Sequence, residues 1–171
     1  MISIIAGKFK GRKLHDMKKL HVRPTQAKVR KSIFQILEPF HNLKVLDLYA
    51  GVGTLGIEAI SRGASKVVFV EKNYNVYKLL KKNLQFIEAE NYDVILSDSI
   101  RFVSGLRDTY FDIVFADPPY AKVKFDMIKD KVDKILKPGG IFCMEMKKEI
   151  INTPHVRIKY YGNTQVVFSK Q

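Results

Sequence analysis

Along residues 44–147, hydrophobic residues alternate between two patterns, one typical of buried strands and one typical of helices. Short and almost continuous apolar runs, typical of buried parallel strands, occupy residues 44–51, 66–72, 92–98, 110–117 and 141–147. Between them, apolar residues recur at helical spacing in residues 54–63, 75–90, 99–108 and 125–140. Strands that alternate with helices favour a mostly parallel sheet with helices on both faces.

The two ends of the chain depart from this alternation. Residues 155–170 predict an antiparallel hairpin that would bring the sheet to seven strands. Near the start, residues 2–14 predict a small hairpin. Residues 25–40 predict an amphipathic helix, with Thr25 as its N-cap and Pro39 near its end. We therefore expect an α/β, Rossmann-like fold with a small hairpin-and-helix extension in front.

The charge of the chain is concentrated in that extension. The net charge is +13, and residues 1–44 hold eleven of the 30 Lys and Arg against only Asp16 and Glu38. A basic front on a nearly balanced body favours a polyanionic partner, nucleic acid first, over a merely solvated basic surface. We predict one domain over residues 1–171, with a basic extension at 1–42 and the core at 43–171.

Composition also indicates the compartment. The single cysteine, Cys143, lies in an apolar run and is expected to be a buried thiol, not part of a disulfide or a Cys-rich metal site. The first residues place an apolar run before a basic cluster, the wrong order for a secretion signal. No apolar stretch reaches the length of a membrane span. We therefore expect a cytoplasmic protein without a metal site, and a monomer by default.

A glycine-rich turn joins the first core strand to its helix. Gly51, Gly53 and Gly56 form the spacing G-x-G-x-x-G, which suits a tight turn and close approach of a ligand to the backbone. Glu71 ends the next strand, 20 residues after Gly51, where a carboxylate can accept hydrogen bonds from both hydroxyls of a ribose. This much fits NAD and S-adenosylmethionine equally well.

Two further acids favour S-adenosylmethionine. Asp47 lies inside the first core strand, where its carboxylate can reach the methionine part of the cofactor. Asp98 ends the third strand and can receive the adenine amine, although it is also well placed to cap the helix that begins at Ser99. Together with Glu71, these acids fall at the carboxyl ends of successive strands, where open α/β sheets bind ligands.

The tetrapeptide Asp117–Tyr120, DPPY, ends the fourth strand at the same edge. Prolines fix φ and carry no N–H, so the Asp117 carboxylate and the Pro118 carbonyl stay available as acceptors, and the Tyr120 ring can stack on a flat base. An exocyclic amine is a poor nucleophile because its lone pair is delocalised into the ring. Two acceptors on its N–H groups favour a tetrahedral nitrogen that aims the lone pair at a methyl carbon. DPPY therefore indicates methyl transfer to a nucleobase amine, with Asp117 or water taking the proton.

Four motifs in order carry a wider resemblance: IIAGKFKGRKL, VRPTQAKVRKSIF, LDLYAGVGTLGIEAISRGA and FADPPY. Together they resemble the bacterial 16S ribosomal RNA guanine-N2 methyltransferase family, over nearly the whole chain. The resemblance implies a class I methyltransferase fold and S-adenosylmethionine as cofactor. It also implies methylation of the exocyclic amine of one guanine in 16S RNA, within a small subunit or an assembly intermediate.

The resemblance also implies roles for individual residues. The residues that would hold S-adenosylmethionine are Asp47, Gly51, Gly53, Glu71 and Asp98. Those that would hold the guanine are Asp117, Pro118 and Tyr120. Those that would bind RNA are Lys8, Lys10, Arg12, Lys13, Arg23, Thr25 and Arg30. The segment MEMKKE, residues 144–149, is unusually basic for this family, and the sequence does not assign it a role.

Other readings explain part of the pattern. An adenine-N6 methyltransferase shares DPPY but normally carries an extra target-reading domain. A protein glutamine methyltransferase normally has Asn in place of Asp117, and a cytosine-C5 enzyme needs a nucleophilic cysteine elsewhere than Cys143. A dehydrogenase leaves DPPY without a role. A ribosome-assembly factor that has lost catalysis would keep the fold, but the predicted site is intact. The adenine-N6 enzyme and the assembly factor stay open as alternatives.

Overall fold

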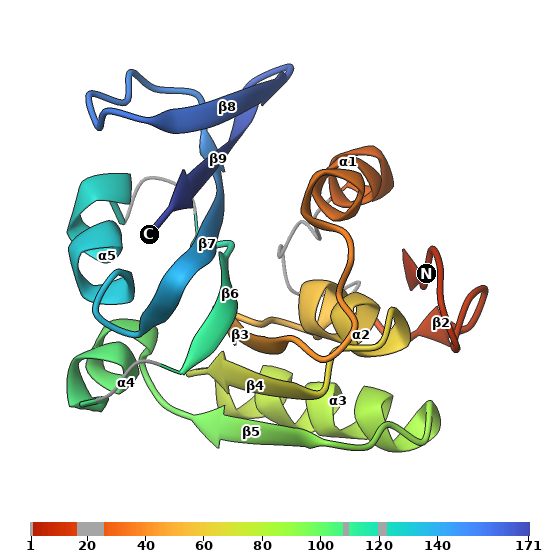
Figure 1. Cartoon of the computed structure of the whole chain (residues 1–171). Helices are drawn as coiled ribbons and strands as arrows, with labels where there is room; N and C mark the ends of the chain where they lie inside the picture. The colour runs from red at the N-terminus through yellow and green to blue at the C-terminus, as the bar shows by residue number, and fades with distance from the viewer. Residues whose placement is uncertain (1, 17–25, 108–109, 120–122) are drawn as a thin grey trace.

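A computed structural model describes residues 2–16, 26–107, 110–119 and 123–171 (Figure 1). The strands are β1 (Ile2–Ser3), β2 (Lys13–Leu14), β3 (Lys44–Leu48), β4 (Lys66–Glu71), β5 (Tyr92–Leu96), β6 (Phe111–Ala116), β7 (Leu136–Lys147), β8 (Val156–Tyr161) and β9 (Thr164–Lys170). The helices are α1 (Ala27–Leu37), α2 (Thr54–Ser61), α3 (Tyr74–Phe86), α4 (Ser99–Gly105) and α5 (Phe125–Val132). None of the helices in these ranges is long and apolar enough to cross a membrane.

A seven-stranded sheet forms the centre of the molecule, in the order β5-β4-β3-β6-β7-β9-β8. The first five of these strands run parallel to one another. β9 is antiparallel to β7, and β8 is antiparallel to β9. This order confirms the predicted Rossmann-like arrangement. Leu48 of β3 pairs with Val70 and with Ala116, and Ala116 pairs with Met144 of β7. The carboxyl ends of the parallel strands therefore lie in one row at one edge of the sheet.

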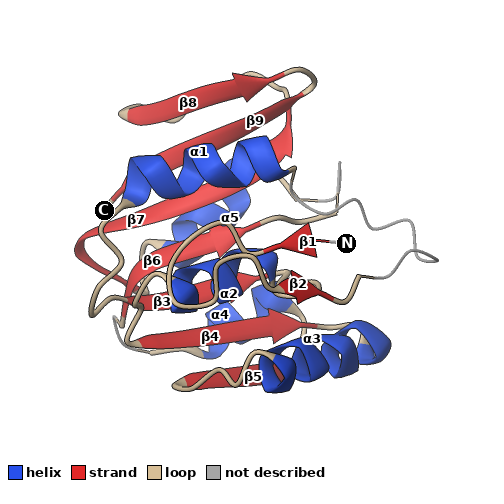
Figure 2. Ribbon diagram, turned by 90° about the vertical axis from the view of Figure 1, so that its right-hand side faces the viewer, coloured by secondary structure: helices blue, strands red, loops and turns tan. Residues whose placement is uncertain are grey.

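Each face of the sheet carries its own hydrophobic core, which explains why the parallel strands are apolar on both sides. Along β3, Val45 faces the core under α1, α2 and α3, whereas Leu46 and Leu48 face the core under α4 and α5. Figure 1 shows α4 and α5 on one side of the sheet and α1 and α2 on the other. Figure 2 shows α1 lying along the part of the sheet formed by β7 and β9.

The N-terminal hairpin of β1 and β2 is attached to the outer surface of α2. Glu58 of α2 accepts hydrogen bonds from the backbone N–H of Ile5 (2.8 Å) and of Ala6 (2.9 Å). Gly7 has φ +82°, and a Cβ added there would lie 1.8 Å from the Ser61 carbonyl oxygen. Only glycine permits this approach, so the turn of the hairpin is fixed directly against the last turn of α2.

The structure corrects predicted boundaries, among them the end of α5 and the N-cap of α1. The helix predicted for residues 125–140 ends at Val132, because the Pro138 stretch belongs to β7. Pro–Gly–Gly is a poor helix sequence, and here its backbone pairs with the chain end: Gln171 N–H donates to the Gly140 carbonyl (2.9 Å). At α1, Gln26 is the N-cap in place of the predicted Thr25, which itself lies outside the described residues.

Candidate active site

The glycine turn after β3 has the geometry of a ligand-binding loop. Gly51 and Gly53 have φ of +57° and +91°, a region that strains other residues. A Cβ added to Gly53 would lie 2.5 Å from Leu80 Cδ1, so this part of the loop lies flat against α3. A Cβ added to Gly51 would meet only the Tyr49 carbonyl, at 3.9 Å. Gly51 therefore leaves open space beside its backbone, where a ligand can approach.

Glu71, the last residue of β4, links the glycine loop to the start of α3. Its Oε2 accepts a hydrogen bond from the Gly51 N–H (3.0 Å), and its Oε1 accepts one from the Asn73 N–H (2.7 Å). A carboxylate oxygen has two acceptor positions, so each oxygen can accept a further donor such as a ribose hydroxyl. The structure therefore places Glu71 beside the Gly51 backbone N–H, and its predicted contact with a ribose stays a prediction.

Asp47 is a buried residue of β3 that binds the backbone just after the glycine loop. Its side chain is 2% exposed, and Oδ2 accepts a hydrogen bond from the Gly56 N–H (2.8 Å) at the start of α2. Burial raises the pKa of Asp47 well above its usual range, and the nearby Asp117 and Glu71 carboxylates add to this, against the opposing effect of the Gly56 N–H. In this structure Asp47 holds the start of α2, and its predicted contact with the cofactor stays a prediction.

Asp98 and Tyr49 meet beside the same loop. Asp98 Oδ1 accepts hydrogen bonds from Ile100 N–H (3.0 Å) and Arg101 N–H (3.1 Å), so the capping role considered for this residue is present. Tyr49 was not predicted. It has φ +59°, and its half-buried hydroxyl has a pKa raised to about 12, by burial first and by Asp98 second. A non-glycine residue in this conformation is strained, which often marks a functional loop. The one sequence signal for Tyr49 is an aromatic residue two positions before the first glycine of the turn.

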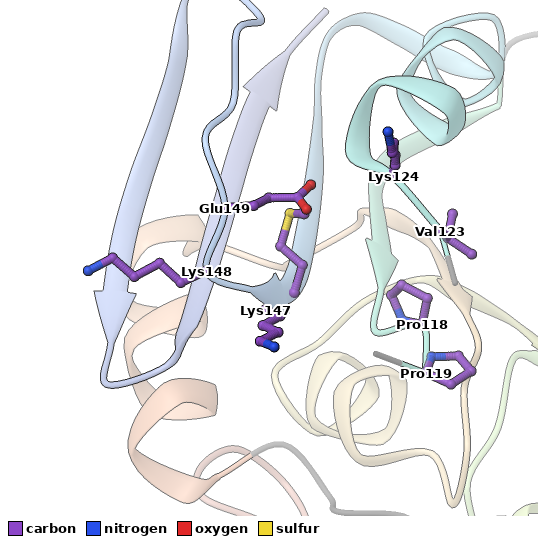
Figure 3. A pocket seen from close by; sticks show the side chains of 8 residues that line it. Pro118, Pro119, Val123, Lys124, Lys147, Lys148 and Glu149 are labelled. Carbon is purple, nitrogen blue, oxygen red and sulfur yellow. The ribbon is translucent and has the colours of Figure 1, made fainter. Parts of the chain in front are cut away.

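The DPP segment follows β6 at the same edge. Asp117 comes directly after Ala116, Pro118 is buried, and Tyr120 lies outside the described residues. Pro118 and Pro119 line one side of a pocket of about 180 Å³. Figure 3 shows these prolines across from the end of β7. The remaining lining residues are Val123, Lys124, Met146, Lys147, Lys148 and Glu149.

The basic hairpin presents its cations to solvent. Lys8, Lys10, Arg12 and Lys13 are all exposed, as an RNA-binding role requires. Lys8 Nζ and Arg12 Cζ lie 5.3 Å and 5.2 Å from the centre of the Phe9 ring, and Arg12 Nη1 donates to the Ile87 carbonyl (3.0 Å). These contacts hold Lys8 and Arg12 near the Phe9 ring. Arg23 and Thr25, also predicted to bind RNA, lie outside the described residues.

Arg30 does not belong to this surface, and the prediction that it contacts RNA is wrong. Its side chain is 3% exposed; Nη2 donates to the Ser3 carbonyl (2.6 Å), and Nε lies 4.0 Å from Glu58 Oε2. Burial lowers the pKa of Arg30, and Glu58 opposes this effect. Arg30 lies on the buried face of α1 because Glu58, an acid within the mostly apolar α2, offers a charged partner there. Sequence reasoning missed Glu58.

The residues present at the edge fit an adenosine-containing cofactor. The space beside Gly51 admits a ligand to the backbone, and the Glu71 oxygens can accept from hydroxyl groups next to it. Tyr49 adds a half-buried aromatic side chain at the same loop. In the part of the chain that the structure describes, no group of three or more His, Cys, Asp and Glu side chains is arranged to hold a metal ion.

Comparisons with known proteins identify the family of this chain. The family model described as conserved hypothetical protein 95 matches residues 2–170. A relative from Haemophilus influenzae, named ribosomal RNA small subunit methyltransferase D, is 36% identical over 157 residues, which cover 86% of this chain and 80% of the relative. The solved structure of a putative methyltransferase from Escherichia coli has a TM-score of 0.89 at 30% identity, covering 99% of this chain and 97% of that one.

A more distant solved structure shares the fold. The Thermus thermophilus 16S rRNA N2 G1207 methyltransferase, in complex with AdoMet and guanosine, has a TM-score of 0.72 at 21% identity and covers 90% of this chain and 44% of its own. This likeness shows a methyltransferase fold, as predicted. The chain therefore belongs to the conserved hypothetical protein 95 family and is a relative of the bacterial enzymes named ribosomal RNA small subunit methyltransferase D.

Proposed function

We propose that this protein transfers a methyl group from S-adenosylmethionine to 16S ribosomal RNA of the small subunit, and that the acceptor is the exocyclic N2 amine of a guanine. The name of the Haemophilus relative supports a small-subunit RNA substrate. The guanosine in the Thermus complex, a protein of the same fold, supports a guanine acceptor. The predicted cytoplasmic location and monomeric state are compatible with this activity and stay predictions.

One observation carries the proposal: the glycine loop and the DPP segment leave neighbouring strands at the same level. Leu48, the last residue of β3, pairs with Ala116, the last residue of β6. The Tyr49–Gly53 loop and Asp117 therefore begin side by side. Asp117 is near enough to Asp47 to raise its pKa. A ligand beside Gly51 and an amine held at Asp117 are thus brought together, and such positioning can supply roughly 7–11 kcal/mol in favourable cases.

The cofactor half of the site orients the methyl donor. When bound, S-adenosylmethionine supplies an electrophilic methyl group on a positively charged sulfur. Glu71 accepts from the ribose hydroxyls, the Gly51 backbone allows close approach, and Asp98 lies just after β5 for the adenine amine. The Asp117 and Glu71 carboxylates also favour a cationic sulfur over a neutral one, because opposite charges attract most strongly where water is excluded.

The acceptor half activates the amine. The Asp117 carboxylate and the Pro118 carbonyl each accept one N–H of the guanine N2 group, which turns the nitrogen lone pair toward the methyl carbon. The new N–C bond forms with that lone pair as the C–S bond breaks, and the C–S electrons stay on sulfur. S-adenosylhomocysteine leaves as a neutral thioether. The amine then gives its surplus proton to Asp117, from which water removes it.

The test uses purified protein, labelled S-adenosylmethionine and four acceptors: small subunits from a strain that lacks this enzyme, free 16S RNA, duplex DNA and total protein. We expect close to one methyl group per small subunit or per 16S RNA, and none on DNA or protein. If the protein binds S-adenosylhomocysteine but methylates no RNA, the proposal fails and the non-catalytic assembly factor is favoured. Methylation of DNA instead would support the adenine-N6 alternative.

A further inference from the structure

The basic segment Lys147–Glu149, to which the sequence assigns no role, lies beside the DPP segment. It is the end of β7 and the start of the loop that follows, and β7 pairs with β6 up to Ala116 and Met144. Its residues form one wall of the pocket whose opposite wall includes Pro118 and Pro119 (Figure 3). The segment is therefore across from the groups proposed to hold the acceptor amine.

The backbone of this wall is held by the C-terminal hairpin. Lys148 N–H donates to the Asn163 carbonyl (2.9 Å), and the Gln165 side chain, which is fully buried, donates through Nε2 to the Glu149 carbonyl (3.0 Å). Lys148 Nζ lies 5.1 Å from the centre of the Tyr160 ring, and in Figure 3 this side chain points away from the pocket toward β8. Of the two lysines in the segment, Lys147 is thus the one available to a ligand in the pocket.

The opposite wall is tied to the same loop. Val123 and Lys124 lead into α5, and Asp126 in the first turn of α5 accepts a hydrogen bond from the Thr153 hydroxyl in the loop between β7 and β8. The two walls are therefore joined at their outer side as well as through the β6–β7 pairing. A pocket with both walls anchored in this way is largely formed before a ligand arrives.

The lining has the chemistry of a nucleotide site. Its described residues comprise Lys124 and Lys147, Lys148 with its side chain turned away, the single carboxylate of Glu149, and the apolar side chains of Pro118, Pro119, Val123 and Met146. Lysines bind the phosphodiester, and the apolar side chains contact the faces of a base. A carboxylate can only accept hydrogen bonds. Guanine carries a donor at N1, whereas adenine carries an acceptor there, so a carboxylate that lies opposite N1 favours guanine over adenine.

We propose that this pocket receives the target guanosine, with Lys147 on its phosphodiester and Glu149 accepting the hydrogen bond from guanine N1–H. The inference rests on the proposed function and deepens it, because it names the residues that position the nucleotide and read the base. Asp117 and Pro118 then hold the neighbouring N2 amine on the same edge of the ring.

The first test removes the charge of Lys147. For Lys147→Gln we expect KM for the RNA substrate to rise about tenfold. The slope of the logarithm of RNA affinity against the logarithm of salt concentration should become less steep by about one. The kcat and the affinity for S-adenosylhomocysteine should be unchanged, and Lys147→Arg should restore KM because it keeps the charge. The matched control is Lys134→Gln. Lys134 is also an exposed lysine, but it precedes β7 at the opposite edge of the sheet, and its loss should change neither quantity.

The second test changes the base. RNA in which 2,6-diaminopurine replaces the target guanine keeps the N2 amine but carries an acceptor at N1. We expect the wild type to prefer guanine by about tenfold or more in kcat/KM, and Glu149→Ala to bring the ratio of the two substrates close to one. Binding of S-adenosylhomocysteine shows that each variant is folded.

The outcomes separate the inference from the proposed function. If the wild type transfers no methyl group to RNA, the proposed function itself fails. If the wild type is active but Lys147→Gln behaves like Lys134→Gln, the phosphodiester contact is overturned while the function stands. If Glu149→Ala keeps the full preference for guanine, the assignment of base reading to Glu149 is overturned in the same way.

Discussion

The two halves of the carboxyl edge are constructed differently. In the cofactor half, at the ends of β3, β4 and β5, the carboxylates of Asp47, Glu71 and Asp98 each accept at least one backbone N–H. In the acceptor half, at the ends of β6 and β7, the exposed side chains of Lys147 and Glu149 extend from an anchored backbone toward a pocket. The first half is an internal network that exists without RNA, whereas the second half presents groups for an external partner.

This difference makes the two halves separable by mutation. Changes in the cofactor half should alter cofactor affinity and the stability of the loop, because the carboxylates proposed to bind the cofactor also hold the loop. Changes in the acceptor half should alter transfer and RNA binding while leaving cofactor affinity and folding nearly as they were.

The largest effect is expected at Asp117. In Asp117→Ala the amine loses its charged acceptor, and we expect kcat to fall by about 10²–10⁴-fold, the usual contribution of a positioned acid–base group. Affinity for S-adenosylhomocysteine should change little. Single-turnover transfer and calorimetry measure the two quantities, and Asp117→Asn, which keeps one acceptor oxygen, should be intermediate. Wild-type turnover in Asp117→Ala would falsify the role given to this residue.

The next effect is expected at Glu71. Hydrogen bonds to a charged group contribute about 1.5–3 kcal/mol each, so Glu71→Ala should raise the Kd for S-adenosylmethionine by about tenfold to hundredfold. The Gly51 and Asn73 N–H groups also lose their acceptor, which should loosen the loop. RNA affinity, measured separately by filter binding, should not change. An equal loss of RNA and cofactor affinity would contradict the division into two halves.

A smaller effect is expected on the basic hairpin, which belongs to neither half. Charge reversal at Lys10, Arg12 and Lys13 should weaken RNA binding and reduce its salt slope by about 0.7–0.9 for each phosphate that is no longer neutralised. Because Arg12 also donates to the Ile87 carbonyl, the pair Lys10→Glu and Lys13→Glu without Arg12 is the cleaner variant. Charge reversal at Lys134, away from the hairpin, serves as control. An unchanged slope in the hairpin variant would mean that RNA binds elsewhere.

The smallest effect is expected in the pH dependence of stability. Burial raises the pKa of Asp47 above its usual value of 3.8, so the folded state keeps a proton that the unfolded state releases. The free energy of unfolding should therefore decrease as pH rises from about 4 through the folded pKa. Asp47→Asn removes the titrating group, so Tm should change less with pH in this variant than in the wild type. Each kcal/mol of stability corresponds to about 2–4 °C in Tm for a chain of this size. Parallel Tm curves for the two proteins would contradict this.

The regular part of the fold was predictable because each element carries its own pattern. The parallel strands are apolar on both sides, and the helices between them repeat their apolar residues at the helical period. Glu71 and the glycine turn could be placed at the same edge of the sheet from the sequence, because the carboxyl ends of neighbouring parallel strands meet there. The family resemblance was confirmed by the family model and the named relatives.

The parts that were missed depend on contacts between distant residues. Arg30 has the sequence features of a surface cation, and only its neighbours Ser3 and Glu58 show that it is buried. Glu58 in turn gains its partners from a hairpin more than 50 residues away. Asp98 was ambiguous because one carboxylate can cap a helix and also face a ligand. The end of α5 was misplaced because β7 takes up the Pro138 stretch through pairing that no local pattern shows.

The decisive measurement is the identity of the methylated atom. RNA methylated by the wild type is digested to nucleosides and analysed by mass spectrometry, alongside RNA that carries inosine, which lacks the N2 amine, at the target position. We predict N2-methylguanosine from the natural RNA and no methyl transfer to the inosine RNA. A methyl group on another atom of guanine or on adenine, or undiminished transfer to the inosine RNA, would contradict the assignment of the DPP segment to the N2 amine.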